Sequence, residues 1–248
     1  MKQSRAKTAA DAQGLRLVPV ERETVQDRVY KELRRALIGG LFEPGQVLTI
    51  RGLADAMMTS TMPVREALGR LVSEKALEAL PQRSVRVPPV TLERVEDLLN
   101  TRILIEGEAI ALACARMGER DIAELNHILS EWGDGHDLNA PSDFDREATL
   151  NQKFHFAIYR CSGSSVLLPM IESLWLQSSP CTRFATYAFS RAIKDRVSPD
   201  VDYYHRAMVN ALERRDPDAA RAALVTDISR PFTFLREQLQ KSDTTSEP

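Results

Sequence analysis

Apolar residues recur at helical spacing over most of the chain, and two short helices lie back to back near residue 60. In the first, the positions i, i+3, i+4 and i+7 are Ile50, Leu53, Ala54 and Met57. In the second, they are Val64, Ala67, Leu68 and Leu71. Each helix therefore buries one stripe and leaves its other face free. The pattern fits a helix-turn-helix and fits any other helical hairpin equally well.

The second helix has residues suited to its first turn. Ser60 or Thr61 can cap it, and Pro63 fits a position where a missing N–H costs little. Arg65 then projects from the free face near the N-terminus of the helix. In helix-turn-helix proteins this region presents side chains to base edges in the DNA major groove. We therefore expect Arg65 to read DNA, with Ser60 and Thr61 at the start of the same helix as further DNA contacts. The alternative is an exposed arginine on a hairpin with no such role.

The flanks of this pair predict a third helix and a small hairpin. A longer helix before the pair ends at Gly39-Gly40, and its stripe is Val25, Val29, Leu33, Ala36 and Leu37. After the pair, residues 79–80 and 85–87 could pair around a turn at 81–84. Three helices followed by a hairpin describe a winged helix. Arg83 and Arg86 would lie on the wing, within reach of phosphates or the minor groove.

Residues 21–90 resemble the GntR family of bacterial transcription regulators. The segments ALIGGLFEPGQVL, LADAM and MPVREALGRL, and the wing from 83 to 87, stand in the family's order and spacing. The resemblance implies a DNA-binding winged helix over residues 21–88, with DNA contacts at Arg51 and Arg65.

Three positions depart from that family pattern. Thr61 stands where the family usually has Arg, Ser84 where the wing usually has Gly, and Gly69 where many members have another Arg. Cationic contacts dominate DNA affinity. Fewer of them imply weaker or differently specified DNA binding.

Charge is divided unevenly between the two parts of the chain. Residues 1–90 hold 15 Lys and Arg against 10 Asp and Glu, a net of +5, whereas residues 91–248 hold 18 against 25, a net of −7. A basic part beside an acidic one suits a DNA-facing domain joined to a domain that avoids DNA, although chance asymmetry could also produce this division.

The remaining composition points to a cytoplasmic protein. The three cysteines are too far apart for a metal motif or a disulfide framework. No apolar run approaches the ~20 residues of a membrane span, and the polar N-terminus is no signal peptide. We expect residues 1–20 to be a disordered tail and 241–248 to be frayed.

Beyond Pro88-Pro89 the pattern is helical almost throughout. Two prolines stop both strand and helix, so an all-helical domain over 91–240 is expected to begin here. The predicted helices cover residues 91–117, 119–132, 142–162, 164–187, 199–214 and 217–240. The fold expected for the whole chain is mainly α, with a winged helix-turn-helix before a six-helix bundle.

Polar residues interrupt the apolar stripes of four of these helices. They are Arg102, the pair Asn151 and His155 at i and i+4, His205, and Asp227. A lone polar group in a core costs several kcal/mol unless it finds a partner. These groups therefore find one another or a bound ligand, or each is separately satisfied by the protein. For Arg102 the alternative partner is Glu106, four residues on.

Residues 91–240 resemble the FCD ligand-binding domain of the FadR-type GntR subfamily, in its six-helix form. The resemblance rests on the segment from Arg102 to Glu106, on NQKFH at 151–155, on YYHRAMVNAL and on ERRDPDAARAALVTD. It implies a divalent metal (Zn, Ni or Mn) held by Asn151, His155, His205 and Asp227. It also implies an effector carboxylate held by Arg102 with the metal.

The metal ligands depart from the family pattern at two positions. Family members commonly have Asp at the first position and His at the last, where this chain has Asn151 and Asp227. Asn is a neutral and weaker ligand, so weaker metal binding is expected. Pro231 lies four residues after Asp227 and has no N–H, so the backbone carbonyl of Asp227 loses its usual helical hydrogen-bond donor. The resulting distortion could direct an oxygen of Asp227 inward.

Together these features predict a homodimeric transcription regulator and not an enzyme. The family resemblance implies a repressor, because repression relieved by a ligand is the commoner arrangement in that family. It would bind a palindromic double-stranded DNA operator and respond to a small organic acid. One alternative is a metal-dependent hydrolase, because a cation held by His and Asp can activate water. The chain, however, has no HExxH or GxSxG motif. The other is a regulator whose C-terminal domain binds no metal and serves only for dimerisation.

Overall fold

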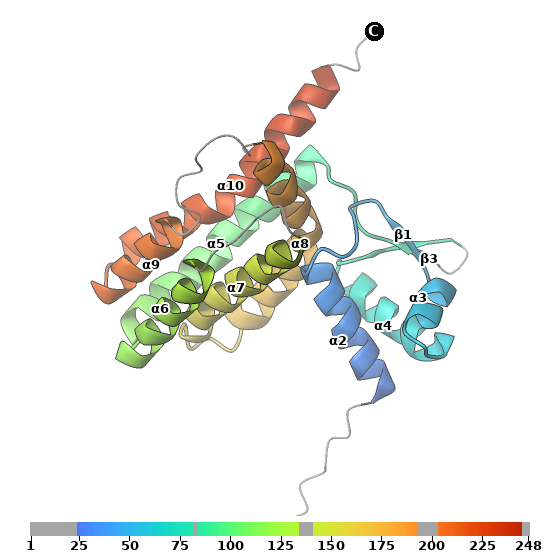
Figure 1. Cartoon of the computed structure of the whole chain (residues 1–248), viewed down its shortest axis with the longest axis horizontal. Helices are drawn as coiled ribbons and strands as arrows, with labels where there is room; N and C mark the ends of the chain where they lie inside the picture. The colour runs from blue at the N-terminus through green and yellow to red at the C-terminus, as the bar shows by residue number, and fades with distance from the viewer. Residues whose placement is uncertain (1–23, 82–83, 134–140, 193–202, 245–248) are drawn as a thin grey trace, which may run out of the picture.

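The computed structural model describes residues 24–81, 84–133, 141–192 and 203–244. The expected tail at 1–20 and Arg83 on the wing lie outside these residues. Two lobes are visible in Figure 1, with the N-terminal helices and strands on one side and a bundle of long helices on the other. The chain is mainly helical, as the periodicity predicts.

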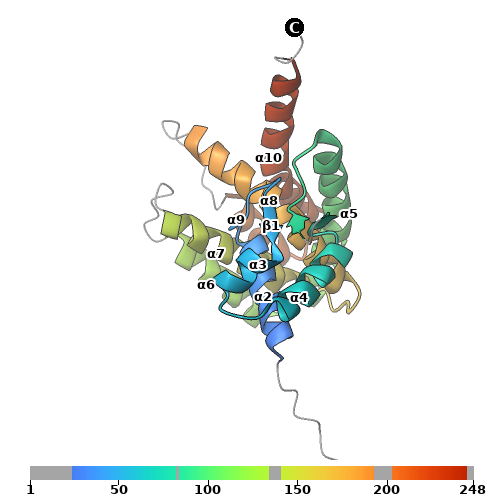
Figure 2. The same cartoon turned by 90° about the vertical axis from the view of Figure 1, so that its right-hand side faces the viewer.

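The N-terminal lobe is a winged helix (Figure 2). Its elements are α2 (Val25–Ile38), β1 (Val47–Thr49), α3 (Ile50–Ala56), α4 (Thr61–Ser73), β2 (Glu78–Leu80) and β3 (Ser84–Arg86). The strands form an antiparallel sheet in the order β1-β3-β2. The sequence predicted the β2–β3 hairpin but not β1, which is three residues long and buries only Leu48.

Local signals fix the ends of these helices. Thr24 and Asp27 form a reciprocal capping box at the start of α2, and the helix stops at Gly39 as expected. Gly40 follows with φ +73°, and its Cα lies so close to the Arg183 side chain that a Cβ there would clash. Ser60 occupies the N-cap of α4, but its side chain makes no capping hydrogen bond, contrary to the expectation.

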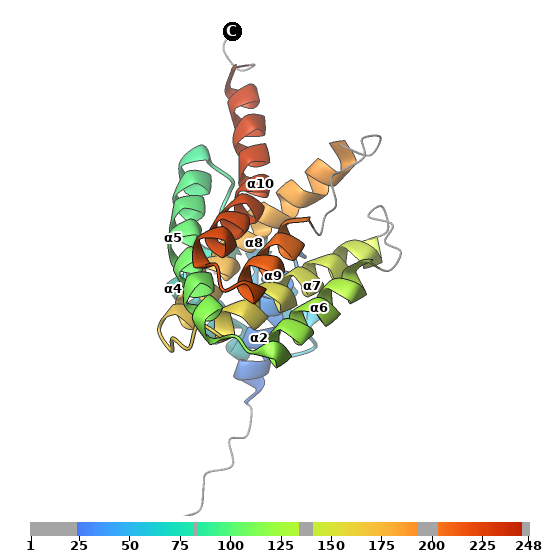
Figure 3. The same cartoon turned by 90° about the vertical axis from the view of Figure 1, so that its left-hand side faces the viewer.

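The C-terminal lobe contains six described helices, and Figure 3 shows how they pack side by side. They are α5 (Leu92–Arg116), α6 (Glu119–Gly133), α7 (Pro141–Arg160), α8 (Leu167–Ala192), α9 (Tyr203–Glu213) and α10 (Pro217–Thr244). Helix α8 begins three residues later than predicted and ends five later, and α10 continues through Pro231 to Thr244. The other ends agree with the predictions to within about a turn.

Two apolar cores hold the lobes together. One lies among the C-terminal helices and includes Phe154, Tyr159 and Phe232, all almost completely buried. The other lies within the winged helix, around Leu37 and Leu71, and Leu176 of α8 packs into it. Helix α8 therefore belongs to the bundle and also inserts a side chain into the core of the winged helix.

Candidate functional site

Helix α4 presents an exposed face in the winged helix. Its inner face packs Pro63, Val64, Ala67, Leu68 and Leu71 into the core. Arg65 lies on the outer face, and neither it nor Arg51 of α3 makes a hydrogen bond or ion pair with the described residues. Ser60 and Thr61 are also exposed. Four side chains expected at the DNA, three of them at the start of α4 and one on α3, are thus accessible.

Other cations of the winged helix are engaged within the protein. Arg86 of the wing pairs with Glu78 on the neighbouring strand, with Nη2 and Oε2 2.6 Å apart. Arg70 of α4 lies over the Tyr30 ring at 3.7 Å and pairs with Asp27 at 3.4 Å. Arg70 therefore tethers α4 to α2, a role that the sequence analysis did not predict.

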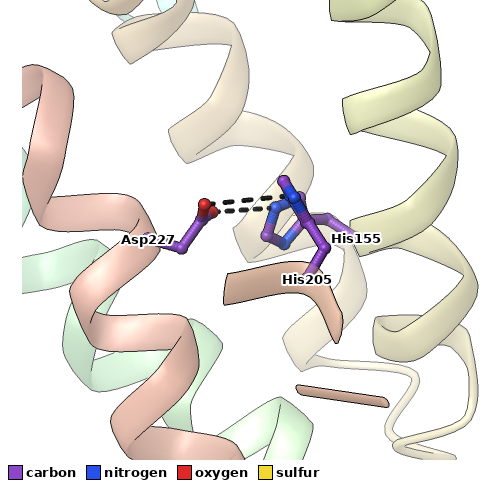
Figure 4. Close-up of side chains that lie close together, drawn as sticks. All are labelled: His155, His205 and Asp227. Atoms are coloured by element: carbon purple, nitrogen blue, oxygen red, sulfur yellow. Dashed lines mark ion pairs between the residues drawn. The ribbon is translucent and has the colours of Figure 1, made fainter. Parts of the chain in front are cut away.

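The four expected metal ligands converge in the helical lobe. Asn151 and His155 come from α7, His205 from α9 and Asp227 from α10. Nε2 of His155 lies 3.2 Å from Oδ2 of Asp227, and Nε2 of His205 lies 3.2 Å from Oδ1 of Asn151 and 3.8 Å from Oδ1 of Asp227. Figure 4 shows both rings pointing at the Asp227 carboxylate.

This geometry fits a metal site. A tetrahedral ion with bonds of about 2.0–2.1 Å separates its ligand atoms by about 3.3 Å. The ligand atoms of the two histidines and Asp227 all lie within 4.8 Å of one another, so small side-chain movements suffice. Two imidazole nitrogens and two oxygens suit a borderline divalent ion such as Zn, Ni or Mn.

Burial and charge prepare Asp227 to act as a ligand. Burial alone raises the pKa of this carboxyl, but the charges of His205 and His155 and the hydrogen bond from His155 lower the pKa to about 2. The group is thus ionised at neutral pH. Aromatic rings enclose the two imidazoles, since Trp132 and Phe154 lie 4.5 and 4.8 Å from His205, measured between ring centroids. Such an apolar shell restricts solvent at a metal site.

Glu106 of α5 gathers a second buried cluster beside this site. It is completely buried and accepts hydrogen bonds from Arg102, Tyr159 and Trp175. Nε of Arg102 lies 2.6 Å from Oε1, and Nε1 of Trp175 lies 3.1 Å from Oε2. The partner of Arg102 is therefore the alternative that the sequence offered, an i,i+4 ion pair, although it is buried and not exposed.

The protonation states in this cluster follow from its charges. Burial lowers the pKa of Arg102, but the neighbouring carboxylate outweighs that effect and raises it, so the guanidinium stays charged. Burial and the same carboxylate raise the pKa of Tyr159 well above its usual value. The Tyr159 hydroxyl thus keeps its proton and donates a hydrogen bond to Glu106.

Tyr159 connects the cluster to the candidate metal site. Its hydroxyl lies 3.2 Å from Nδ1 of His155. If Nε2 of His155 ligates a metal, Nδ1 carries the ring proton and donates a hydrogen bond to the Tyr159 hydroxyl oxygen. The sequence analysis did not single out Tyr159, Trp175 or Ser178. The i,i+4 spacing of His155 and Tyr159 could have indicated the first of these.

Comparisons with known proteins agree for both lobes. Residues 25–87 match the model of bacterial regulatory proteins of the gntR family, and residues 97–230 match the FCD domain. The chain is 29% identical over 214 residues to the HTH-type transcriptional regulator McbR of Escherichia coli (strain K12), across 86% of this chain and 94% of that protein. It is 31% identical over 214 residues to the HTH-type transcriptional repressor GlaR of the same strain, across 85% and 95%.

A solved structure has the same fold. The structure of E. coli McbR/YncC superposes with a TM-score of 0.71 at 28% sequence identity, across 87% of this chain and 98% of that one. The similarity extends over both lobes. No helix in the described part of the chain has the length and apolar character to cross a membrane.

Proposed function

Because the chain belongs to the GntR family of bacterial regulatory proteins and carries an FCD domain, we propose that it is a homodimer whose affinity for a palindromic DNA operator depends on a bound metal and a small organic acid. The protein is a transcription regulator. The hydrolase alternative is set aside because the relatives of this chain are DNA-binding regulators. The observation that carries the proposal is the convergence of Asn151, His155, His205 and Asp227.

For DNA reading, we assign the outer face of α4 to the major groove. Arg65 suits O6 and N7 of a guanine, a contact worth ~1–3 kcal/mol of discrimination. Arg51, Ser60 and Thr61 are exposed and suit phosphates. Arg86 can join them only by leaving Glu78, a half-exposed pair of small energetic value. Two such helices in a dimer would read half-sites about 10 bp apart.

For effector binding, we assign the region around Arg102 and the four candidate metal ligands. A bound divalent ion supplies a positive centre that a carboxylate can ligate. Among the described residues, Arg102 directs Nε and Nη2 to Glu106, whereas Nη1 makes a long contact of 3.4 Å with the Ser178 hydroxyl. Nη1 carries two N–H groups and makes the longest of these contacts, so it is the atom that we assign to an effector carboxylate. Asp227 and Glu106 select against ligands of high negative charge.

The route from this site to the DNA runs along α8. Trp175 and Ser178 of α8 contact the Arg102–Glu106 pair, Leu176 packs in the winged-helix core, and Glu172 pairs with Arg34 of α2 at 3.1 Å. A small shift of α8 on ligand binding would therefore move the winged helix. The relative GlaR is named a repressor, and release of repression by the ligand is the sign that we propose here.

The test begins with metal. The purified protein is stripped with a chelator, reloaded with Zn²⁺, Ni²⁺ or Mn²⁺, and its metal content measured for wild type, His155→Ala, His205→Ala and the control His127→Ala, whose imidazole is 73% exposed on α6. We expect about one ion per chain in wild type and control, and loss from the other two variants. Equal metal content in all four would favour the metal-free alternative.

The same preparations then test the control of DNA binding. The probes are a duplex selected by the wild type from a random pool and a panel of mono-, di- and tricarboxylates. We expect a dimer of twice the 27.8 kDa chain mass by light scattering. We also expect at least one acid to weaken DNA binding by about 5- to 150-fold, the usual range of allosteric coupling, and only in the metal-loaded wild type and control. If DNA affinity is the same with and without the metal and the acids, the proposal is wrong.

A further inference from the structure

Met62 lies at the centre of the outer face of α4. Residues three, four and seven positions apart share one side of a helix, so Met62 is aligned with Gly69, and Arg65 and Glu66 flank that line. The inner stripe of α4 points the opposite way. The side chain of Met62 is 58% exposed, and it takes no part in the winged-helix core. A large apolar side chain thus occupies the middle of a face on which a protein usually places polar residues.

The fold gives no reason for the glycine on the same line. Gly69 is in the interior of α4, where glycine is unfavourable relative to alanine. A Cβ built at this position meets nothing within 4 Å. The absence of a side chain there therefore leaves room outside the molecule, along the line that begins at Met62. A glycine on a helix face permits another surface to approach the backbone closely.

The charges on this face favour base edges over phosphates. Arg65 and Glu66 carry opposite charges on the two sides of the Met62–Gly69 line, and both are exposed. A face of zero net charge gains little from the phosphate backbone, to which cationic contacts bind. In the major groove, thymine alone among the four bases presents a methyl group, and apolar side chains read it by contact.

We infer that Met62 reads the 5-methyl group of a thymine that neighbours the guanine read by Arg65, and that Gly69 allows the helix to lie close enough for both contacts. This inference rests on the proposed placement of α4 in the major groove. Side chains at i and i+3 are about 5–6 Å apart at Cβ, a separation suited to adjacent base pairs. Each half-site of the operator thus contains a thymine next to a guanine.

The test removes one methyl group at a time from the DNA. Deoxyuridine replaces each thymine in turn in a duplex that the wild type has selected from a random pool, and dissociation constants are measured by fluorescence anisotropy. For wild type, we expect one position in each half-site to lose about fourfold in affinity, the value of one buried methyl group. Met62→Ala loses about as much on the unmodified duplex and becomes insensitive to deoxyuridine at that position.

Met58→Ala is the matched control, because Met58 is 95% exposed in the turn before α4 and should bind like wild type. The Met62 inference is wrong if no deoxyuridine weakens wild-type binding, or if Met62→Ala keeps the wild-type sensitivity. Arg65→Ala separates this failure from a larger one. If that variant loses affinity while Met62→Ala does not, only the thymine contact is refuted, and if neither loses affinity, α4 is not the reading helix.

Discussion

The Tyr159 hydroxyl links the buried cluster around Glu106 to the candidate metal site of the helical lobe. It donates to Glu106 and lies 3.2 Å from Nδ1 of His155. Partners of this kind fix the tautomer and orientation of a ligating imidazole. Glu106 in turn holds Arg102, so one carboxylate orients both the proposed effector-binding cation and, through Tyr159, a proposed metal ligand.

Tyr159→Phe is therefore expected to weaken metal binding by about 10- to 100-fold, the usual effect of removing such a partner. The ring volume is retained, so the change isolates the hydroxyl. Metal affinity is measured by competition with a chromophoric chelator. Tyr30→Phe is the control, since the Tyr30 hydroxyl also bonds a glutamate, Glu74, but in the winged helix. Equal metal affinity in both variants and the wild type would refute this role of Tyr159.

For single residues, the sequence predicted which side chains lie close together better than it predicted their hydrogen-bond partners. The spacing of Asn151 and His155 and the family resemblance together indicated the four candidate ligands, and the structure brings these side chains together. The Tyr159 and Trp175 contacts to Glu106 could not be predicted, because periodicity shows that a side chain is buried without showing its partner. The same holds for Arg70, whose stacking on Tyr30 joins residues 40 positions apart.

Among the elements, α8 connects the two lobes. Successive residues of this helix face different partners, since Trp175 contacts Glu106 and Leu176 packs in the winged-helix core. One turn earlier, Glu172 pairs with Arg34 across the junction, and both side chains are partly exposed, at 41% and 28%. Such a pair contributes little to stability, but it is well placed to transmit a movement of α8 to α2.

Glu172→Gln is expected to leave the melting temperature almost unchanged and to reduce the effect of metal and acid on DNA affinity. The measured quantity is the ratio of dissociation constants for the selected duplex with and without the metal and the active acid. The control is Glu32→Gln, which removes an exposed ion pair with Arg35 within α2. If both variants keep the wild-type ratio, the contact between Arg34 and Glu172 does not carry the coupling.

Most elements could be predicted because their stripes are long and regular. The six helices of the C-terminal lobe and the three of the winged helix follow from helical periodicity, caps and Gly-Gly or Pro-Pro stops. Strand β1 was missed because three residues with one buried side chain, Leu48, give no alternation to recognise. Leu176 inserts into a core whose other buried residues lie between positions 29 and 87. This contact depends on tertiary packing and leaves no local signal in the sequence.

For the whole molecule, the uneven distribution of charge fits a DNA-binding winged helix joined to a helical lobe that does not bind DNA. The net of +5 on residues 1–90 and of −7 on residues 91–248 would orient the winged helix toward DNA and the helical lobe away from it. Steering of this kind is screened by salt. We expect the proposed base recognition at α4 to depend less on salt, because it would act through short contacts in the groove.

The most direct test of the account is the affinity of Arg65→Ala for the DNA that the wild type selects. Fluorescence anisotropy at fixed salt compares it with the wild type and with Arg120→Ala, which removes an exposed arginine from α6. We predict that Arg65→Ala loses at least about fivefold in affinity, as expected for a base contact of ~1–3 kcal/mol, and no longer discriminates guanine at one position of each half-site. Wild-type affinity and base preference in Arg65→Ala would contradict the central claim that this side chain of α4 reads the operator.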